Sequence, residues 1–415
     1  MSGAVLNLAL TPTDTKVSLR VWSAVGSMSM CVALLIASEF MPVSLLTPIA
    51  RDLHATAGMA GQAISISGLF AVLMSLSVPS IAARMDRRIL LMALTATMLV
   101  SLMLIASAPN FMVLMIARAL LGLTIGGFWA LSTATIMLLV PTEKVPKALG
   151  VLYMGNAVAV AFAAPIGSYL GGLIGWRGVF WSLVPLVAIN IAWQRRALPA
   201  MPPEGGSASK RLGALELLRR PHVAVAMVAT MLSFAGAFST FTYLRPFLEV
   251  RTGVNVTQLS VVLLGAGLAG FAGTYAASAL LPRRLYRLLA LLPLALAIAT
   301  LAFLSVGNLL WPAALILVAW GAINAAIPVA WSTWLSQGVA DQADAGGGLL
   351  VAAIQLAIML GAAVGGFLLD HVSLTATWIG GAAMLLLAAI LVGRGGRLMP
   401  HRTVEATTAI PIEQR

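Results

Sequence analysis

Two charged side chains stand deep inside long apolar runs, and they are the strongest candidates for chemistry in this chain. Glu39 lies in a run that begins near residue 22, and Arg118 in one that begins near residue 110. A charge in the core of a bilayer costs at least about 2.5–3.5 kcal/mol, so it is normally functional or paired. Loss of water favours the protonated form of a carboxyl group, so Glu39 can bind and release a proton as its access to water changes. We expect Glu39 to carry protons and Arg118, which keeps its charge, to tune it. The alternatives are a structural hydrogen bond for Glu39 and snorkelling of Arg118 to an interface.

The composition requires membrane-spanning helices to position these side chains. Of the 415 residues, 60% are hydrophobic and 9% are charged, whereas an average soluble domain is about 25% charged. A water-soluble enzyme and a disordered chain are therefore excluded. The apolar runs are long and unbroken instead of alternating as in a transmembrane β-barrel, so the sequence predicts an all-α membrane protein.

Stretches of about 20 apolar residues predict twelve transmembrane helices. A polar gap at 195–221 reads as a flexible cytoplasmic linker between two six-helix halves, residues 1–194 and 222–393, followed by a tail at 394–415. Short basic loops follow both the second and the eighth span, as in transporters whose halves rock about a midplane site. The expected spans are 22–46, 58–82, 88–107, 110–139, 148–171, 177–194, 222–247, 258–281, 285–305, 310–335, 349–369 and 373–393.

The basic residues orient these spans. With a cytoplasmic N-terminus, twenty of them fall in cytoplasmic segments and three in outer loops, which is the asymmetry of the positive-inside rule. The net charge of +12 therefore reflects topology and does not indicate nucleic acid binding. One cysteine and four scattered histidines offer no metal site, and neither a dinucleotide-binding fingerprint nor an ATP-binding loop is present. We expect no cofactor, no metal and no enzymatic activity.

Several motifs resemble the major facilitator superfamily, in its twelve-span drug/proton antiporter branch, over essentially the whole chain. They are the basic loop 84–88, the Arg-x-x-x-Gly pattern from Arg118 to Gly122, the proline-glycine pattern at 164–167 and the Gly-Trp-Arg turn at 175–177. The resemblance implies that the loop and the proline-glycine pattern control gating. One departure is that the acidic residue of the family's loop falls on Ala83. Asp86 either takes over its role or only neutralises its basic neighbours. The implied gating residues are Asp86, Arg87, Arg88, Pro165 and Gly167.

Within this branch, the stretches 39–48, 126–130, 139–141, 145–149, 241–246, 328–334 and 340–343 are similar to bacterial exporters of purine ribonucleosides. This similarity implies a monomer in the bacterial inner membrane that exports inosine- and guanosine-like nucleosides in exchange for protons. A multidrug or sugar exporter of the same fold is the alternative. A channel or a scaffold is disfavoured, because a channel needs a polar line through several spans and a scaffold has no need of Glu39 and Arg118.

A nucleoside offers a flat base for stacking and hydroxyl groups for hydrogen bonds, so its site needs aromatic faces and polar groups. An uncharged amide in the middle of a span also needs partners. The tryptophans could equally face lipid or form an interfacial belt. The substrate-binding candidates are Trp129, Asn156, Tyr243, Arg245, Asn324, Trp331, Trp334 and Gln355.

The topology is directly testable. Because the basic residues divide twenty to three, a reporter fused after residue 200 is expected in the cytoplasm and one fused near Gly253 in the periplasm. Paired phosphatase and fluorescent-protein fusions measure both positions. A linker at 195–221 found outside the cell would overturn the span assignment.

Overall fold

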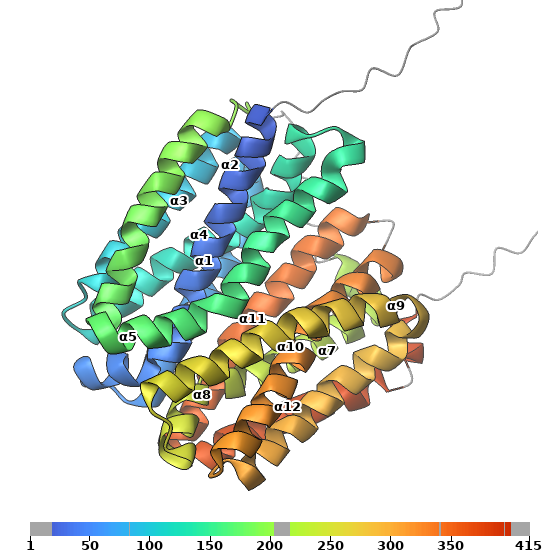
Figure 1. Ribbon diagram of the computed structural model, residues 1–415. Helices are drawn as coiled ribbons and strands as arrows, with labels where there is room; N and C mark the ends of the chain where they lie inside the picture. Colours follow the sequence, from blue (N-terminus) through green and yellow to red (C-terminus); the bar gives the residue numbers. More distant parts are fainter. Residues whose placement is uncertain (1–18, 83, 203–215, 340–341, 394, 400–415) are drawn as a thin grey trace, which may run out of the picture.

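The computed structural model describes residues 19–82, 84–202, 216–339, 342–393 and 395–399. Within these ranges the regular elements are all helices, so the predicted all-helical fold is confirmed (Figure 1). The long helices are α1 (Leu19–Asp52), α2 (Ala57–Ala82), α3 (Arg87–Ala106), α4 (Phe111–Leu139), α5 (Val145–Ala197), α7 (Pro221–Phe241), α9 (Val256–Val306), α10 (Leu310–Gly338), α11 (Ala343–His371) and α12 (Leu374–Val392). Short elements are α8 (Leu244–Phe247), η1 (Thr142–Lys144), η2 (Leu217–Arg219), η3 (Leu248–Thr252) and η5 (Gly396–Leu398).

Ten helices in the described ranges are long and apolar enough to cross a membrane, so the chain is a multi-pass membrane protein. Two of them, α5 with 53 residues and α9 with 51, are far longer than the others. A straight helix of that length would measure about 80 Å, more than twice the roughly 30 Å of a bilayer core. Neither helix is straight. Each contains a residue with non-helical backbone angles, and the predicted count of twelve spans requires each helix to cross the membrane twice.

Helix α5 folds back on itself at Gly175, where the backbone has φ 71° and ψ 163°. Glycine adopts this region of positive φ without the steric cost that a side chain would add. The ammonium group of Lys147 lies 5.2 Å from the ring centre of Trp22, and Trp193 Nε1 donates to Ser23 Oγ at 2.7 Å. Both ends of α5 therefore lie beside the start of α1, and Figure 1 shows the two green arms that meet at the bend.

Helix α9 is interrupted in the same way at Arg284, which has φ −140° and ψ 29°. The hydroxyl of Thr252, just before α9, donates to the carbonyl oxygen of Gly307, just after it, at 2.5 Å. The two ends of α9 thus lie together. The predicted spans 258–281 and 285–305 correspond to its two arms. The predicted span 222–247, in contrast, is broken, because α7 ends at Phe241 and the chain continues through α8.

Local side-chain caps explain where several helices begin. Asn110 accepts a hydrogen bond from the backbone N–H of Val113 at 3.0 Å at the start of α4. Asn255 and Gln258 form a reciprocal capping box at the start of α9, and Ser373 caps α12. Each cap binds a backbone N–H that has no partner inside the helix.

The buried apolar side chains divide into two large clusters. The N-terminal cluster runs from Ala24 to Met201 and belongs to α1–α5 and the segment that follows. The C-terminal cluster runs from Leu217 to Leu398, with Val43, Ile64 and Ala164 joined to it. In Figure 1 the blue-to-green and the yellow-to-red helices correspondingly form two groups, with α11 lying between them.

The two clusters meet tightly around Tyr243, in the break between α7 and α8. Its side chain is completely buried, and its hydroxyl lies 2.7 Å from the carbonyl oxygen of Ala362 and 3.5 Å from that of Gly58. The ring sits in a socket of glycines from both clusters. A Cβ atom added at Gly61 or Gly366 would collide with the Tyr243 side chain. We call this contact region the seal.

Polar contacts between α2 and α11 extend the seal. The carboxylate of Asp370, in the last turn of α11, accepts the backbone N–H of Gly58 at 3.0 Å and the hydroxyl of Thr56. Gln62 Nε2 donates to the carbonyl oxygen of Ala363 at 3.4 Å, and Ser65 Oγ to that of Met359 at 3.0 Å. Asp370 therefore caps the start of a helix in the other cluster, where a negative charge is favourable.

The socket makes a sharp prediction. A Gly61→Ala substitution places a methyl group where Tyr243 sits, and overpacking of this kind costs about 1–3 kcal/mol. The sealed arrangement is expected to lose about five- to 150-fold in relative population. The measurement is the rate at which a thiol reagent labels Ser65→Cys in the purified protein, with Cys31 replaced by serine. Because the sealed arrangement buries position 65, the labelling rate should rise in the Gly61→Ala protein.

Gly150→Ala is the matched control, because a Cβ atom added there meets no other atom within 4 Å. It should leave the labelling rate unchanged. Equal rates in the Gly61→Ala and Gly150→Ala proteins would contradict the socket.

Candidate functional site

Arg118 on α4 is completely buried, and four hydrogen bonds to α1 and α2 hold its guanidinium group. Nε donates to the carbonyl oxygen of Ala63 at 2.9 Å, and Nη1 to that of Ser38 at 2.9 Å. Nη2 donates to the carbonyl oxygen of Glu39 at 3.4 Å and to the Ser67 hydroxyl at 3.0 Å. These bonds fix α4 against its two neighbours. All four acceptors are uncharged, so they solvate the positive charge without neutralising it.

The carboxyl group of Glu39 supplies the charge that these acceptors lack. Glu39 lies in the middle of α1, is only 3% exposed, and interacts electrostatically with Arg118. The attraction is stronger in this buried place than it would be in water. In the part of the chain that the structure describes, His, Cys, Asp and Glu form no group of three that could hold a metal.

Gln355 brings the second cluster to this pair. It comes from α11, is buried, and its side chain interacts with the carboxyl group of Glu39. Its Nε2 atom nevertheless makes no bond with full hydrogen-bond geometry in the described part of the chain. The predicted residues Glu39, Arg118 and Gln355 are thus brought together from α1, α4 and α11.

Three other substrate candidates are half-buried. Trp129 stacks on Tyr153, with ring centres 5.6 Å apart and an interplanar angle of 30°. Asn156 on α5 and Asn324 on α10 are also half-buried. These side chains keep surface that a ligand could contact.

Trp331 and Trp334 differ from them, because they are 1% and 0% exposed. They contact each other edge to face inside the C-terminal cluster. The indole N–H of Trp334 donates to the carbonyl oxygen of Leu398 at 3.1 Å. In this arrangement both tryptophans pack the core, and neither presents a free ring face.

Tyr243 and Arg245 lie in the seal. Arg245 Nε donates to Glu249 Oε1 at 2.7 Å, and its Nη1 atom donates to the backbone carbonyl of Ser44 on α1. Both side chains therefore bond to the N-terminal cluster. Tyr243 contacts the carbonyl oxygen of Gly58, and Arg245 contacts that of Ser44.

The residues predicted to control gating make contacts within the N-terminal cluster. Asp86 accepts the backbone N–H of Arg88 at 2.7 Å and that of Met201 at 3.1 Å. Arg88 Nη2 donates to the carbonyl oxygen of Arg195 at 2.5 Å, and the N–H of Arg87 bonds to Met201. The loop is thus tied to the end of α5.

Pro165 and Gly167 lie buried in α5. A Cβ atom added at Gly167 would come within 2.9 Å of Ser44 Oγ and 3.2 Å of Met41 Cγ. Gly167 therefore allows α5 to approach α1 closely.

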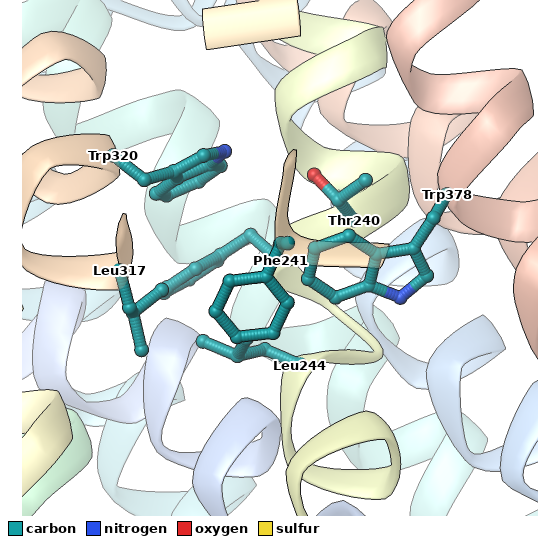
Figure 2. A pocket seen from close by; sticks show the side chains of 7 residues that line it. Thr240, Phe241, Leu244, Leu317, Trp320 and Trp378 are labelled. Atoms are coloured by element: carbon teal, nitrogen blue, oxygen red, sulfur yellow. The ribbon is translucent and has the colours of Figure 1, made fainter. Parts of the chain in front are cut away.

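Two cavities accompany the site. One of about 660 Å³ opens at the seal and is lined by Thr47, Pro48, Arg51, Asp52, His54, Arg245, Glu249 and Val250. The other, of about 10 Å³, lies among apolar side chains of the C-terminal cluster (Figure 2). It is at the lower limit for one water molecule and far too small for a nucleoside. Neither cavity is lined by Glu39.

Asp370 and Gln62 join α2 to α11 and are not among the site residues predicted from the sequence. Asp370 lies one residue beyond the predicted span 349–369. At that position the sequence predicts a loop, and a carboxylate in a loop is solvated by water and needs no protein partner. Its only signal was an acidic side chain at the end of an apolar run. Asp370 has a partner only because α11 packs against α2, and the sequence does not show that these two helices are neighbours.

Comparisons with known proteins agree with this architecture. The family model described as the Major Facilitator Superfamily matches residues 28–347. The transcription regulatory protein OpdE of Pseudomonas aeruginosa is 47% identical over 376 residues, which cover 89% of this chain and 92% of that protein. The purine ribonucleoside efflux pump NepI of Salmonella typhimurium is 41% identical over 379 residues, 91% of this chain and 95% of the pump.

Two solved structures share the fold at 15% identity. A bacterial homologue of the human lysosomal transporter Spinster, inward-facing and unoccupied, has a TM-score of 0.73 and covers 90% of this chain and 96% of its own. The nucleoside transporter NupG has a TM-score of 0.73 and covers 90% of this chain and 98% of its own. The family match over most of the chain, the two relatives that span nearly its whole length and the shared fold lead to one conclusion: this chain belongs to the Major Facilitator Superfamily of membrane transporters.

Proposed function

We propose that this protein is a proton-coupled antiporter that exports purine ribonucleosides, such as inosine and guanosine, from the cytoplasm. The observation that carries the proposal is the buried carboxyl group of Glu39, which interacts with Arg118 in its own cluster and Gln355 in the other. The 41% identity to the efflux pump NepI supports the substrate class. A multidrug or sugar exporter of the same fold is the alternative.

The coupling step follows from the charges around Glu39. When its carboxyl group is ionised, it balances the charge of Arg118; when it is protonated, that charge is left to four uncharged acceptors. The amide of Gln355 can donate to the carboxylate through Nε2 or accept from the protonated acid through Oε1. Gain or loss of the proton therefore changes the bond between the two clusters.

We propose that α5 and α9 each cross the membrane twice, which gives twelve spans in two six-helix halves, residues 1–194 and 222–393. The segments 195–221 and 394–415, with both termini, are cytoplasmic in this layout, and the monomer lies in the bacterial inner membrane. The fold-back of α5 at Gly175 and of α9 near Arg284 supports this layout. The seal then lies at the periplasmic end, so substrate and proton exchange with the cytoplasm in this conformation.

In this proposal Trp129, Asn156 and Asn324 contact the substrate through the exposed surface of their side chains, and Gln355 contacts it from beside Glu39. Tyr243 and Arg245 close the periplasmic end instead, because their polar atoms are bonded in the seal. Closing of the cytoplasmic end is governed by the basic loop and by two residues of α5. These gating residues are Asp86, Arg87, Arg88, Pro165 and Gly167.

A second candidate function rests on the 47% identity to OpdE, which is named a transcription regulatory protein. A membrane protein can influence transcription either by sensing a small effector directly or by changing the cytoplasmic concentration of that effector through transport. The two functions separate experimentally. A regulatory effect that persists in a transport-dead variant favours sensing, whereas one that disappears favours transport.

The substrate class is tested in everted vesicles from cells that overproduce the protein. Radiolabelled inosine is expected to accumulate inside these vesicles when a proton gradient is imposed, and excess guanosine is expected to compete. Cytidine and arabinose should compete poorly, because a smaller ring or a non-aromatic solute gains less from stacking. Gradient-driven accumulation of arabinose or of a cationic drug, with no inosine uptake, would contradict the nucleoside assignment.

The coupling residue is tested by Glu39→Gln, which keeps the shape of the side chain but cannot ionise. Gradient-driven inosine uptake is expected to fall to the rate seen without a gradient, while equilibrium binding of inosine is largely retained. Glu143→Gln is the matched control, because Glu143 is exposed in the loop before α5. Normal uptake with a normal pH dependence in the Glu39→Gln protein would remove Glu39 from the coupling step.

A further inference from the structure

Four aromatic side chains meet at the depth of Glu39 and form a cluster that joins the two halves of the core. Phe40, the next residue after Glu39 on α1, lies 5.7 Å from Phe238 and 6.2 Å from Phe241 on α7, measured between ring centres. Phe241 in turn stacks on Trp320 of α10, 6.0 Å away, at an interplanar angle of 8°. We call Phe40, Phe238, Phe241 and Trp320 the aromatic cluster.

Two members of the cluster keep free surface. Phe238 and Trp320 are buried, but Phe40 and Phe241 are only half-buried. Phe241 is the one residue between 233 and 248 that is not buried. On α1, the half-buried positions Ala33, Ala37 and Phe40 follow helical spacing on one face. Two small side chains there leave surface in front of the Phe40 ring.

The cluster is held rigidly from behind. The indole N–H of Trp320 donates to the hydroxyl of Thr300 at 3.2 Å, which fixes the plane on which Phe241 stacks. Figure 2 shows Trp320 and Phe241 lying parallel. The cavity behind them, about 10 Å³, has no room for a ligand. A ring that joins this cluster must therefore do so on the exposed side of Phe40 and Phe241.

We infer that Phe40 and Phe241 form the surface against which the planar ring of the transported solute stacks. The inference rests on the proposed function as an exporter, and it specifies how that site recognises its substrate. Aromatic faces bind a planar ring by offset or edge-to-face contact. Phe40 follows Glu39 on α1, so a solute that stacks on Phe40 lies at the depth of that carboxyl group. The purine base of a nucleoside is the matching chemical class.

Phe40 and Phe241 are not among the aromatic residues that the sequence predicts for the substrate site. Trp331 and Trp334 are enclosed in the C-terminal cluster, and Trp129 stacks on Tyr153. Phe40 lies on α1 and packs against both clusters, whereas Phe241 lies on α7 and packs against the C-terminal cluster. A solute stacked on both would therefore contact both halves at once.

The test measures binding of radiolabelled inosine to the purified full-length protein. Phe40→Leu and Phe241→Leu keep apolar bulk but remove the flat ring, and each is expected to weaken binding by about five- to 150-fold. Phe40→Tyr and Phe241→Tyr keep the ring and should bind inosine within a few-fold of the parent. Phe367→Leu is the control, because Phe367 is exposed on α11 and stacks on His371.

A second readout is independent of these variants. Inosine should change the fluorescence of Trp320, so the ligand-induced change in the parent protein should shrink in the Trp320→Phe protein. If the parent binds inosine, but the leucine variants bind it equally well and the Trp320→Phe protein gives the same fluorescence change, the stacking surface is wrong and the proposed function stands.

Solutes of other classes separate the two proposals. If the parent transports no nucleoside but binds ethidium, and the leucine variants weaken ethidium binding, the stacking surface stands and the nucleoside function is wrong. If the parent transports only arabinose, which has no aromatic ring, both are wrong.

Discussion

The structure depends most on the buried positive charge of Arg118. A guanidinium group removed from water costs several kcal/mol unless its donors find acceptors. The chain meets this cost with four acceptors on α1 and α2 and with the carboxyl group of Glu39 beside them. The three helices must approach closely for this, and Gly122 of α4 lies so near Ser67 that a Cβ atom there would collide with its backbone. The close packing of α1, α2 and α4 and the solvation of the Arg118 charge therefore depend on each other.

The contact between the two clusters is built differently. Glycines, backbone carbonyl groups and single side chains such as Tyr243 and Asp370 make its polar part. Bonds of this kind are worth about 0.5–1.5 kcal/mol each, and charged ones about 1.5–3. The contact between the tightly packed cores therefore combines individually weak polar bonds with the aromatic contacts of Phe40 with Phe238 and Phe241.

The sequence predicted well what depends on composition and on single residues. The helical membrane fold and the turn near Gly175 follow from runs of apolar residues, and the buried position of Glu39 and Arg118 follows from their place deep in such runs. It did not predict the partners, because these depend on which helices touch. Asp370 was indistinguishable from a loop carboxylate, and the sequence did not show that Trp331 is buried in this arrangement. The break after Phe241 was hidden, since the apolar run continues through it.

In the proposed antiport, the carboxyl group of Glu39 gives up its proton when substrate binds. The most direct measurement is proton release from the purified protein on addition of inosine, followed with a pH indicator in weakly buffered solution. The account predicts release from the parent protein at a pH where Glu39 is protonated, and none from the Glu39→Gln protein. Equal release from both proteins, or none from a parent that binds inosine, would contradict it.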